Sequence, residues 1–124
     1  MKLTNLEMSE HLAFLDSIKT KVKGKTAYAV ARNIRKLANE VYDYEATKDA
    51  LLYTHGEVNE SGRAFVQVGT EGYKNFLNEI KDIALIEHEV DLYCISEEEI
   101  WNSELNADEI LKMDFMIKDI EKDS

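Results

Sequence analysis

A long row of apolar residues spaced three and four apart is the feature that most constrains the fold. The spacing predicts one helix over some 25 residues, on the order of 40 Å long, with Thr26 as its N-cap and Gly56 at its end. A seam this long needs a covering partner, either the preceding helix folded back or a second subunit, and both remain open. The row consists of Ala27, Val30, Ile34, Leu37, Val41, Tyr44 and Leu51, with Lys48 as its polar interruption.

Shorter helices are expected on both sides of this seam, since the chain has no proline and only five glycines. Thr4 and Glu7 match a capping box, and the apolar spacing after them predicts a first helix that stops at Gly24. Three further helices are expected to begin later in the chain. Thr70 and Asn106 are predicted N-caps, and Ser96 opens a short helix that contains Trp101. The apolar row of the last helix is Ile110, Met113, Met116, Ile117 and Ile120.

Two segments instead alternate with the period of a strand. Arg63 to Val68 and Glu89 to Cys94 each place every second residue on one face, and Cys94 is interpreted as a small core residue. Together with the helix between them, these strands suit a small βαβ-like unit. We therefore expect an α+β, mainly helical fold: a long central helix packed on two or three shorter helices, with a small two- or three-stranded sheet. Residues 1–120 are expected to form a single domain and residues 121–124 a frayed tail.

The cysteine count and hydropathy indicate where such a chain works. Its 124 residues contain one cysteine, which excludes an internal disulfide and agrees with a reducing compartment. The first residues show no apolar run typical of a signal peptide, and no segment approaches the roughly 20 apolar residues of a membrane span. We expect a cytoplasmic protein without membrane contact.

Charge is divided unevenly along the chain. Residues 1–48 carry nine basic and six acidic side chains, whereas residues 49–124 carry six basic and nineteen acidic ones. Three interpretations of the basic stretch stay open: solvated helix faces that balance the acidic half, a contact with another protein, or a nucleic-acid site in which lysines beside a helix N-terminus attract phosphate. Nucleic acid is disfavoured as a partner because the net charge is −10. The basic stretch consists of Lys19, Lys21, Lys23, Lys25, Arg32, Arg35 and Lys36.

Aromatic and acidic residues complete the candidate interaction set. Tyr28 and Tyr42 lie beside the long seam, and exposed tyrosines of this kind are typical of interfaces, although core packing explains them as well. Glu97, Glu98 and Glu99 begin the short helix that holds Trp101, where negative charge is favoured by the helix dipole.

The sequence patterns that could indicate a phosphate-binding, catalytic or metal site are weak matches. Gly24-Lys25-Thr26 resembles the end of a phosphate-binding loop, but Lys19 stands where the first glycine belongs. His88 and Cys94 share a strand face yet are too far apart to form a thiol–imidazole pair. The acidic runs around His88 and at Glu97 to Glu99 lack the convergent spacing of a metal site. No catalytic, metal or cofactor residue is predicted.

Four segments resemble a family of small uncharacterised proteins from tailed phages and prophages of Gram-positive bacteria. They are Met1 to Glu7, Thr26 to Leu37, Phe76 to Ile80 running on to Glu87 to Leu92, and Leu105 to Leu111 with Phe115 to Ile117. The resemblance implies a phage origin and a non-enzymatic role. It carries over no catalytic residue.

These observations favour a non-enzymatic, phage-encoded protein that binds another protein. One version is a virion or assembly component, present in the infected cell or the virion, in which the basic half of one copy meets the acidic half of the next. The alternative is an acidic inhibitor of a host defence protein, acting by nucleic-acid mimicry or by direct blocking. A small enzyme is the least favoured interpretation.

Overall fold

The fold has the expected α+β, mainly helical class, with one long helix and two separate two-stranded sheets. The computed structural model describes residues 1–101 and 103–118, so Ile120 and the predicted frayed tail lie outside the described residues. No helix in these two ranges is long and apolar enough to cross a membrane. The elements are β1 (Lys2–Thr4), α1 (Asn5–Ile18), α2 (Gly24–His55), β2 (Glu57–Val58), β3 (Ala64–Phe65), α3 (Glu71–Ala84), β4 (Glu87–Glu89), α4 (Glu97–Trp101), α5 (Ala107–Lys112) and the 3-10 helix η1 (Asp114–Met116).

The first helix begins as predicted but ends earlier. The Thr4 hydroxyl accepts from the Glu7 amide at 3.1 Å and the Glu7 carboxylate accepts from the Thr4 amide at 3.0 Å, which completes the capping box. The predicted stop at Gly24 is wrong, because α1 ends at Ile18 and a short loop carries the buried Val22 into the core. Gly24, with φ of 58°, is instead the first residue of α2.

Thr26 was expected to cap the long helix, and this is also wrong. The N-cap position is Lys23, which makes no side-chain capping bond. Thr26 lies within the first turn, is buried, and donates its hydroxyl to the carbonyl of Glu99 at 3.1 Å. The hydroxyl therefore joins α2 to α4 instead of closing the helix end.

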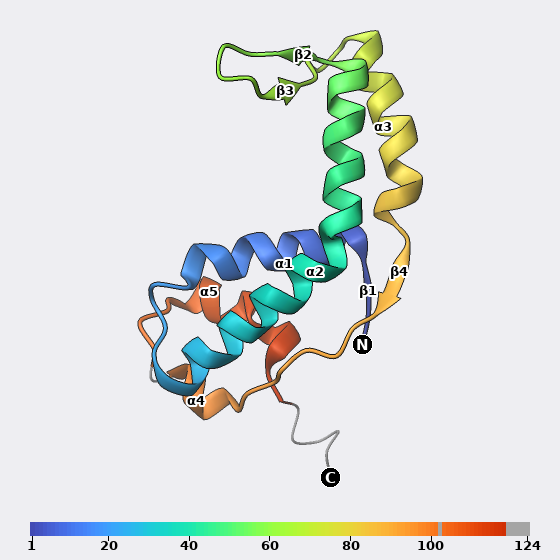
Figure 1. The fold of residues 1–124 in the computed structure, drawn as a ribbon. Coiled ribbons are helices and arrows are strands. Elements are labelled where there is room, and N and C mark those ends of the chain that lie inside the picture. The colour runs from blue at the N-terminus through green and yellow to red at the C-terminus, as the bar shows by residue number, and fades with distance from the viewer. Residues whose placement is uncertain (102, 119–124) are drawn as a thin grey trace.

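The long helix α2 ends at Gly56 as predicted, and its seam is covered within the chain. Its first half packs along α1 and its second half packs beside α3. Figure 1 shows that α2 changes direction between these halves, so that the second half projects away from α1. We call β1, α1, the first half of α2 and residues 87–101 and 103–118 the body, and residues 42–84 the arm.

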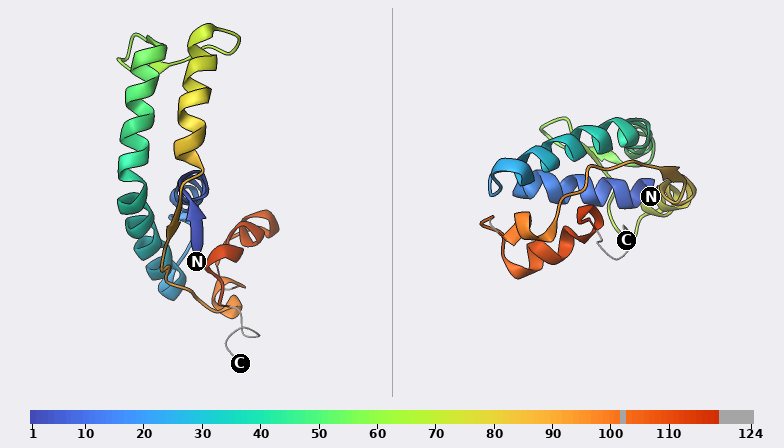
Figure 2. Two further views of the ribbon diagram at one scale, coloured as in Figure 1. Left: turned by 90° about the vertical axis from the view of Figure 1, so that its right-hand side faces the viewer. Right: turned by 90° about the horizontal axis from the view of Figure 1, so that it is seen from below.

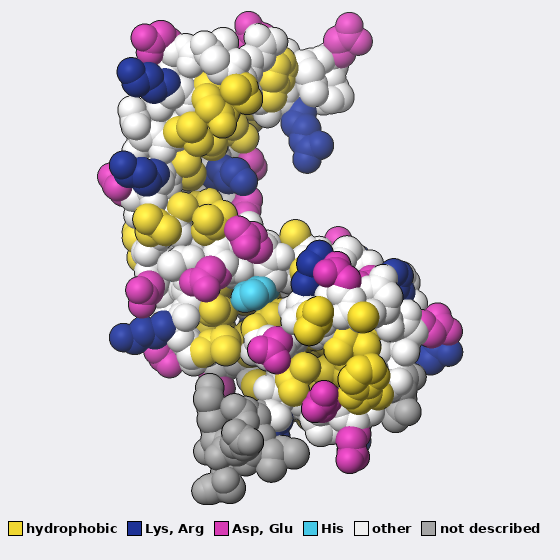
Figure 3. Space-filling view, turned by 180° about the vertical axis from the view of Figure 1, so that it is seen from behind, with side chains coloured by type: hydrophobic (Ala, Val, Ile, Leu, Met, Phe, Trp, Pro, Cys, Tyr) yellow, Lys and Arg dark blue, Asp and Glu magenta, His cyan; other side chains and the backbone are white. Residues whose placement is uncertain are grey.

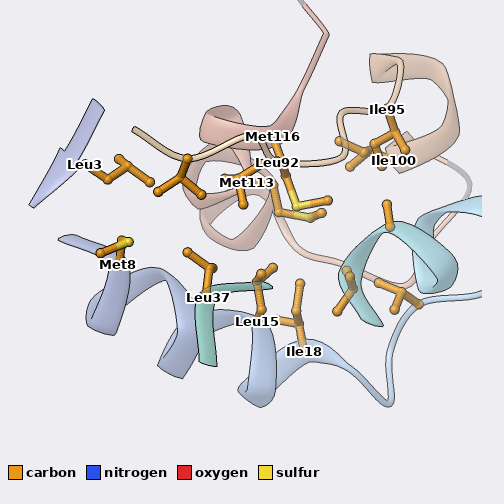
Figure 4. Packing of buried hydrophobic residues seen from close by; sticks show 14 of the residues in the cluster. Leu3, Met8, Leu15, Ile18, Leu37, Leu92, Ile95, Ile100, Met113 and Met116 are labelled. Carbon is orange, nitrogen blue, oxygen red and sulfur yellow. The ribbon is translucent and has the colours of Figure 1, made fainter. Parts of the chain in front are cut away.

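The main core lies in the body. Met8, Leu15 and Ile18 of α1 are fully buried, and side chains from the C-terminal third of the chain pack against them. Figure 4 shows these two sets meeting, with Met113 and Met116 close to Leu15. The last segment is tied in by backbone pairing, since the amide of Ile95 donates to the carbonyl of Met116 at 3.0 Å.

The predicted βαβ-like unit does not form. β4 pairs antiparallel with β1, with Leu3 opposite His88, while β3 pairs with β2 in a hairpin at the tip of the arm. The strands on either side of α3 thus belong to different sheets. Figures 1 and 2 place them at opposite ends of that helix.

Cys94 was expected in the core, but it is exposed. Val90 and Leu92 are buried as predicted, and the next buried residue is Ile95, so the alternation shifts by one position. The shift has a physical cause. Asn33 hydrogen-bonds to the backbone of Tyr93, which fixes that residue at the surface of α2 and turns Cys94 outward.

The arm has a small apolar cluster of its own. Tyr44, Phe76, Ile80 and Ala84 are its buried members, and they lie between the second half of α2 and α3. At the base of the arm, the side-chain amide of Asn5 donates to the carbonyl of Ile83 at 2.8 Å. Figure 3 shows a hollow between the tip of the arm and the body.

Candidate interaction site

The four lysines that begin the basic stretch form ion pairs within the chain. Three of the four carboxylates come from the acidic C-terminal third, so the two oppositely charged parts of the sequence meet in one molecule. The hydrogen bond that the Lys21 ammonium donates to the Glu109 carboxylate lowers the pKa of that carboxyl below its ordinary value. The pairs are Lys19–Asp16 at 2.6 Å, Lys21–Glu109 at 2.9 Å, Lys23–Glu104 at 3.9 Å and Lys25–Glu99 at 3.6 Å.

A pocket of about 470 Å³ lies at the N-terminus of α2. The phosphate-loop likeness of Gly24 to Thr26 falls here, but a helix precedes it where a phosphate loop follows a strand. The carboxylates of Glu98 and Glu99 line the same pocket as Lys23 and Lys25 and oppose an anion there.

The acidic residues of α4 and β4 do not converge on a metal site. In the part of the chain that the structure describes, no group of three or more His, Cys, Asp or Glu side chains could hold a metal ion. Glu97 and Glu98 are exposed at the start of α4, and Trp101 at its end is 62% exposed. Trp101 thus faces solvent, and no ring contact joins it to Tyr28 or Tyr42 among the described residues.

The structure brings Tyr28 and Arg32 together with Tyr93, which the sequence analysis did not select. The rings of Tyr28 and Tyr93 meet edge to face with centroids 5.4 Å apart. The Arg32 guanidinium lies 5.7 Å from each ring centroid, and its Nη1 donates to the Tyr28 hydroxyl at 3.1 Å. We call Tyr28, Arg32 and Tyr93 the platform. All three side chains are exposed, and such cation–π pairs contribute about 0.5–1 kcal/mol at exposed sites.

A buried amide holds the platform in place. Asn33 has no exposed surface; its Oδ1 accepts from the Tyr93 amide at 2.8 Å and its Nδ2 donates to the Tyr93 carbonyl at 2.9 Å. These two bonds fix residue 93 beside Tyr28 on the neighbouring turn of α2. Sequence reasoning missed Asn33, although an amide between Val30 and Leu37 on an apolar row was a usable signal.

The remaining predicted cations of α2 lie next to the platform. Arg35 is exposed one turn beyond Arg32, on the same side of the helix. Lys36 donates to the backbone carbonyl of Asp91. No ion pair joins Arg32, Arg35 or Lys36 to a carboxylate anywhere in residues 1–101 and 103–118, in contrast to the four lysines before them.

Tyr42 is not part of this cluster. It is 72% exposed but lies fourteen residues from Tyr28, about 21 Å along the helix. Tyr42 stands where the arm leaves the body. It is therefore a separate exposed aromatic residue.

The arm presents a second, apolar surface. Leu77 on α3 is 43% exposed and Val68 beside the hairpin is 80% exposed, and Phe65, Val66 and Tyr73 are only partly buried. Figure 3 shows hydrophobic side chains gathered on the arm where it borders the hollow. A second pocket, of about 480 Å³, lies at the base of the arm between α1 and α2.

No protein-family model matches the chain, and neither a curated protein nor a solved structure matches it. The resemblance to phage proteins therefore stays a prediction from the sequence.

Proposed function

We propose that this chain is a non-enzymatic protein that binds another protein through its arm, and that a second copy of the chain is its partner. The observation that carries this is the composition of α3, which is apolar over a wider face than the arm buries. Phe76, Ile80 and Ala84 are covered by α2, whereas Leu77 and Tyr73 on the same helix remain accessible.

Two antiparallel helices bury only the sides by which they contact each other, so apolar residues on their other sides stay accessible. Helical bundles cover the remaining apolar positions with further helices, which a partner arm would supply.

Charges border the exposed apolar side chains. Lys74 and Lys81 lie one turn before and after Leu77, and Asp49 lies one turn before Leu52 on α2. The structure gives none of these three charges an ion pair in the described ranges. Opposite charges of a second arm are their natural partners.

The assembly role predicted from the sequence is kept, but the contact is placed elsewhere. Head-to-tail pairing of the basic and acidic halves is less favoured, because the lysines from Lys19 to Lys25 already have carboxylates in their own chain. An apolar arm contact leaves these pairs intact. A location in an infected cell or a virion follows only from the sequence resemblance and is proposed with it.

The acidic inhibitor remains the second candidate. Glu97 and Glu98 support it, since both are exposed next to Trp101 and neither forms an ion pair within the described residues. Against it, Glu99, Glu104 and Glu109 are partly neutralised by lysines of the same chain. Binding of a basic partner that weakens steeply with salt would favour this candidate.

Light scattering after size exclusion tests the proposal. We expect at least twice the monomer mass of 14.3 kDa at both low and high salt, because an apolar contact is not screened by ions. The double variant Leu77→Ser, Val68→Ser should elute as a monomer with an unchanged helical spectrum. Leu111→Ser is the control, since Leu111 is 74% exposed on α5, outside the arm. A wild-type mass of 14.3 kDa at every concentration would contradict self-association.

A further inference from the structure

The platform is a preorganised surface. Asn33 donates one hydrogen bond to the backbone of Tyr93 and accepts another from it, which fixes residue 93. The edge-to-face contact fixes the Tyr93 ring against Tyr28, and the Tyr28 hydroxyl orients the Arg32 guanidinium. Ordering free side chains on binding opposes association, so groups already held in place favour it. Exposed Tyr and Arg side chains are also the types enriched among residues that dominate binding energy.

Most of the hydrogen-bonding capacity of this surface is free. A guanidinium has five N–H donors, and within residues 1–101 and 103–118 Arg32 makes one hydrogen bond, to the Tyr28 hydroxyl. Arg35 forms no hydrogen bond or ion pair with any described residue. The first acidic residue along α2 is Glu40, beyond both arginines. The positive charge of the first half of α2 is therefore not neutralised by its own helix.

A carboxylate is the chemical group that best matches the free donors of Arg32 and Arg35. Arginine pairs with carboxylates in a two-bond geometry, and Arg32 and Arg35, one helical turn apart, suit two carboxylates of an extended segment. The tyrosine rings add apolar contact area for the residues beside them. A long nucleic acid fits less well, because it draws its affinity from many phosphate contacts, whereas this surface offers few cations on a chain of net charge −10.

We propose that the platform, together with Arg35, binds a segment of a partner protein that carries two carboxylates beside an apolar side chain. The surface lies on the first half of α2, outside the arm, so this inference does not depend on the arm contact. Loss of self-association leaves it standing, and loss of peptide binding leaves the arm proposal standing.

Nuclear magnetic resonance with a short peptide tests the inference. The probe has two glutamates separated by one glycine, and a phenylalanine two residues after the second glutamate, so that all three side chains share one face of an extended chain. Its control has glutamine in place of both glutamates. We expect saturable shifts of the Arg32 Nε–H signal and of the Tyr28 and Tyr93 ring signals with the glutamate peptide only.

Substitutions separate the platform from general charge. Arg32→Gln should raise the dissociation constant about tenfold, since it removes a charge-assisted hydrogen bond to the carboxylate. Arg35→Gln should also weaken binding, whereas Lys19→Gln should not, because Lys19 is paired with Asp16. All three positions are exposed, so the variants should fold as the parent does. Equal binding of the glutamine peptide, absence of saturable shifts, or tighter binding of a short single-stranded DNA would each overturn the inference.

Discussion

Asn33 is a fully buried polar residue of α2, and its buried neighbours on the same helix face, Val30 and Leu37, are apolar. Replacing it with alanine leaves the amide and the carbonyl of Tyr93 without their partner, and each lost bond of this kind costs about 1–3 kcal/mol. We expect Asn33→Ala to lower the free energy of unfolding by roughly 2 kcal/mol, as measured by urea denaturation. Asn39→Ala is the control, because Asn39 is exposed on the same helix. Equal losses in both variants would show that the amide has no special role.

His11 gives the fold a dependence on pH. Its ring stacks on Phe115 with centroids 3.9 Å apart, and burial lowers its pKa below the ordinary value, against the opposing charges of Glu7 and Glu10. Because the unfolded chain binds this proton more readily, stability should fall as the pH drops below about 6.5.

The matched variant is His11→Phe, which keeps an aromatic stack and cannot titrate. We expect the urea midpoint of the wild type to fall further between pH 7.5 and pH 5.5 than the midpoint of the variant. The other two histidines are the same in both proteins, so the difference between the two profiles reports on residue 11. Parallel pH profiles would refute the assignment to His11.

Residue-scale prediction from the sequence worked where the signal was local. The caps at Thr4, Thr70 and Asn106 are confirmed, because each hydroxyl or amide bonds to a backbone amide three residues later. Asn33 and Cys94 could not be placed in this way. Their surroundings depend on contacts across some sixty residues of chain, which no local pattern encodes.

At the element scale, helix periodicity was a better guide than strand alternation. The long helix and its end at Gly56 followed from apolar spacing, because a helix makes its backbone bonds within one segment. A strand makes its backbone hydrogen bonds to another strand, and its alternating pattern does not identify which strand that is. β4 therefore pairs with residues 2–4 at the start of the chain, and β3 pairs with its sequence neighbour across a turn.

The arm should unfold more readily than the body, because its buried cluster is small. Phe76→Ala removes a ring from that cluster and should cost the arm about 3–5 kcal/mol. Hydrogen exchange followed by mass spectrometry should show faster exchange in α3 and the hairpin, with α1 unchanged. Leu111→Ala, at an exposed body position, should leave both regions unchanged. Equally accelerated exchange in arm and body would mean that the two form one cooperative unit.

On the scale of the whole molecule, the charge division of the sequence acts as an internal contact. The loop between α1 and α2 carries lysines toward the acidic segment that contains α4 and α5, so opposite charges from the two parts of the chain lie together. Exposed ion pairs contribute at most about 1 kcal/mol each. They therefore favour the position of the acidic segment beside the loop but add little to its stability. The apolar core beneath supplies the main stabilisation.

Charge reversal distinguishes an internal role from one between chains. Lys23→Glu with Lys25→Glu places negative charge against Glu104 and Glu99, whereas Lys21 is left intact because its partner Glu109 also caps α5. We expect faster hydrogen exchange in α4 and a stability loss of at most about 2 kcal/mol, with no change of mass in light scattering.

Lys2→Glu controls for added negative charge, since Lys2 is exposed and forms no ion pair in the described ranges. It should change neither exchange in α4 nor mass. If the double reversal instead lowered the mass to that of a monomer, the lysines would be acting between molecules. The head-to-tail arrangement would then replace the arm as the assembly contact. An unchanged mass with a loosened α4 would show that the two lysines act within one molecule, as their ion pairs with Glu99 and Glu104 indicate.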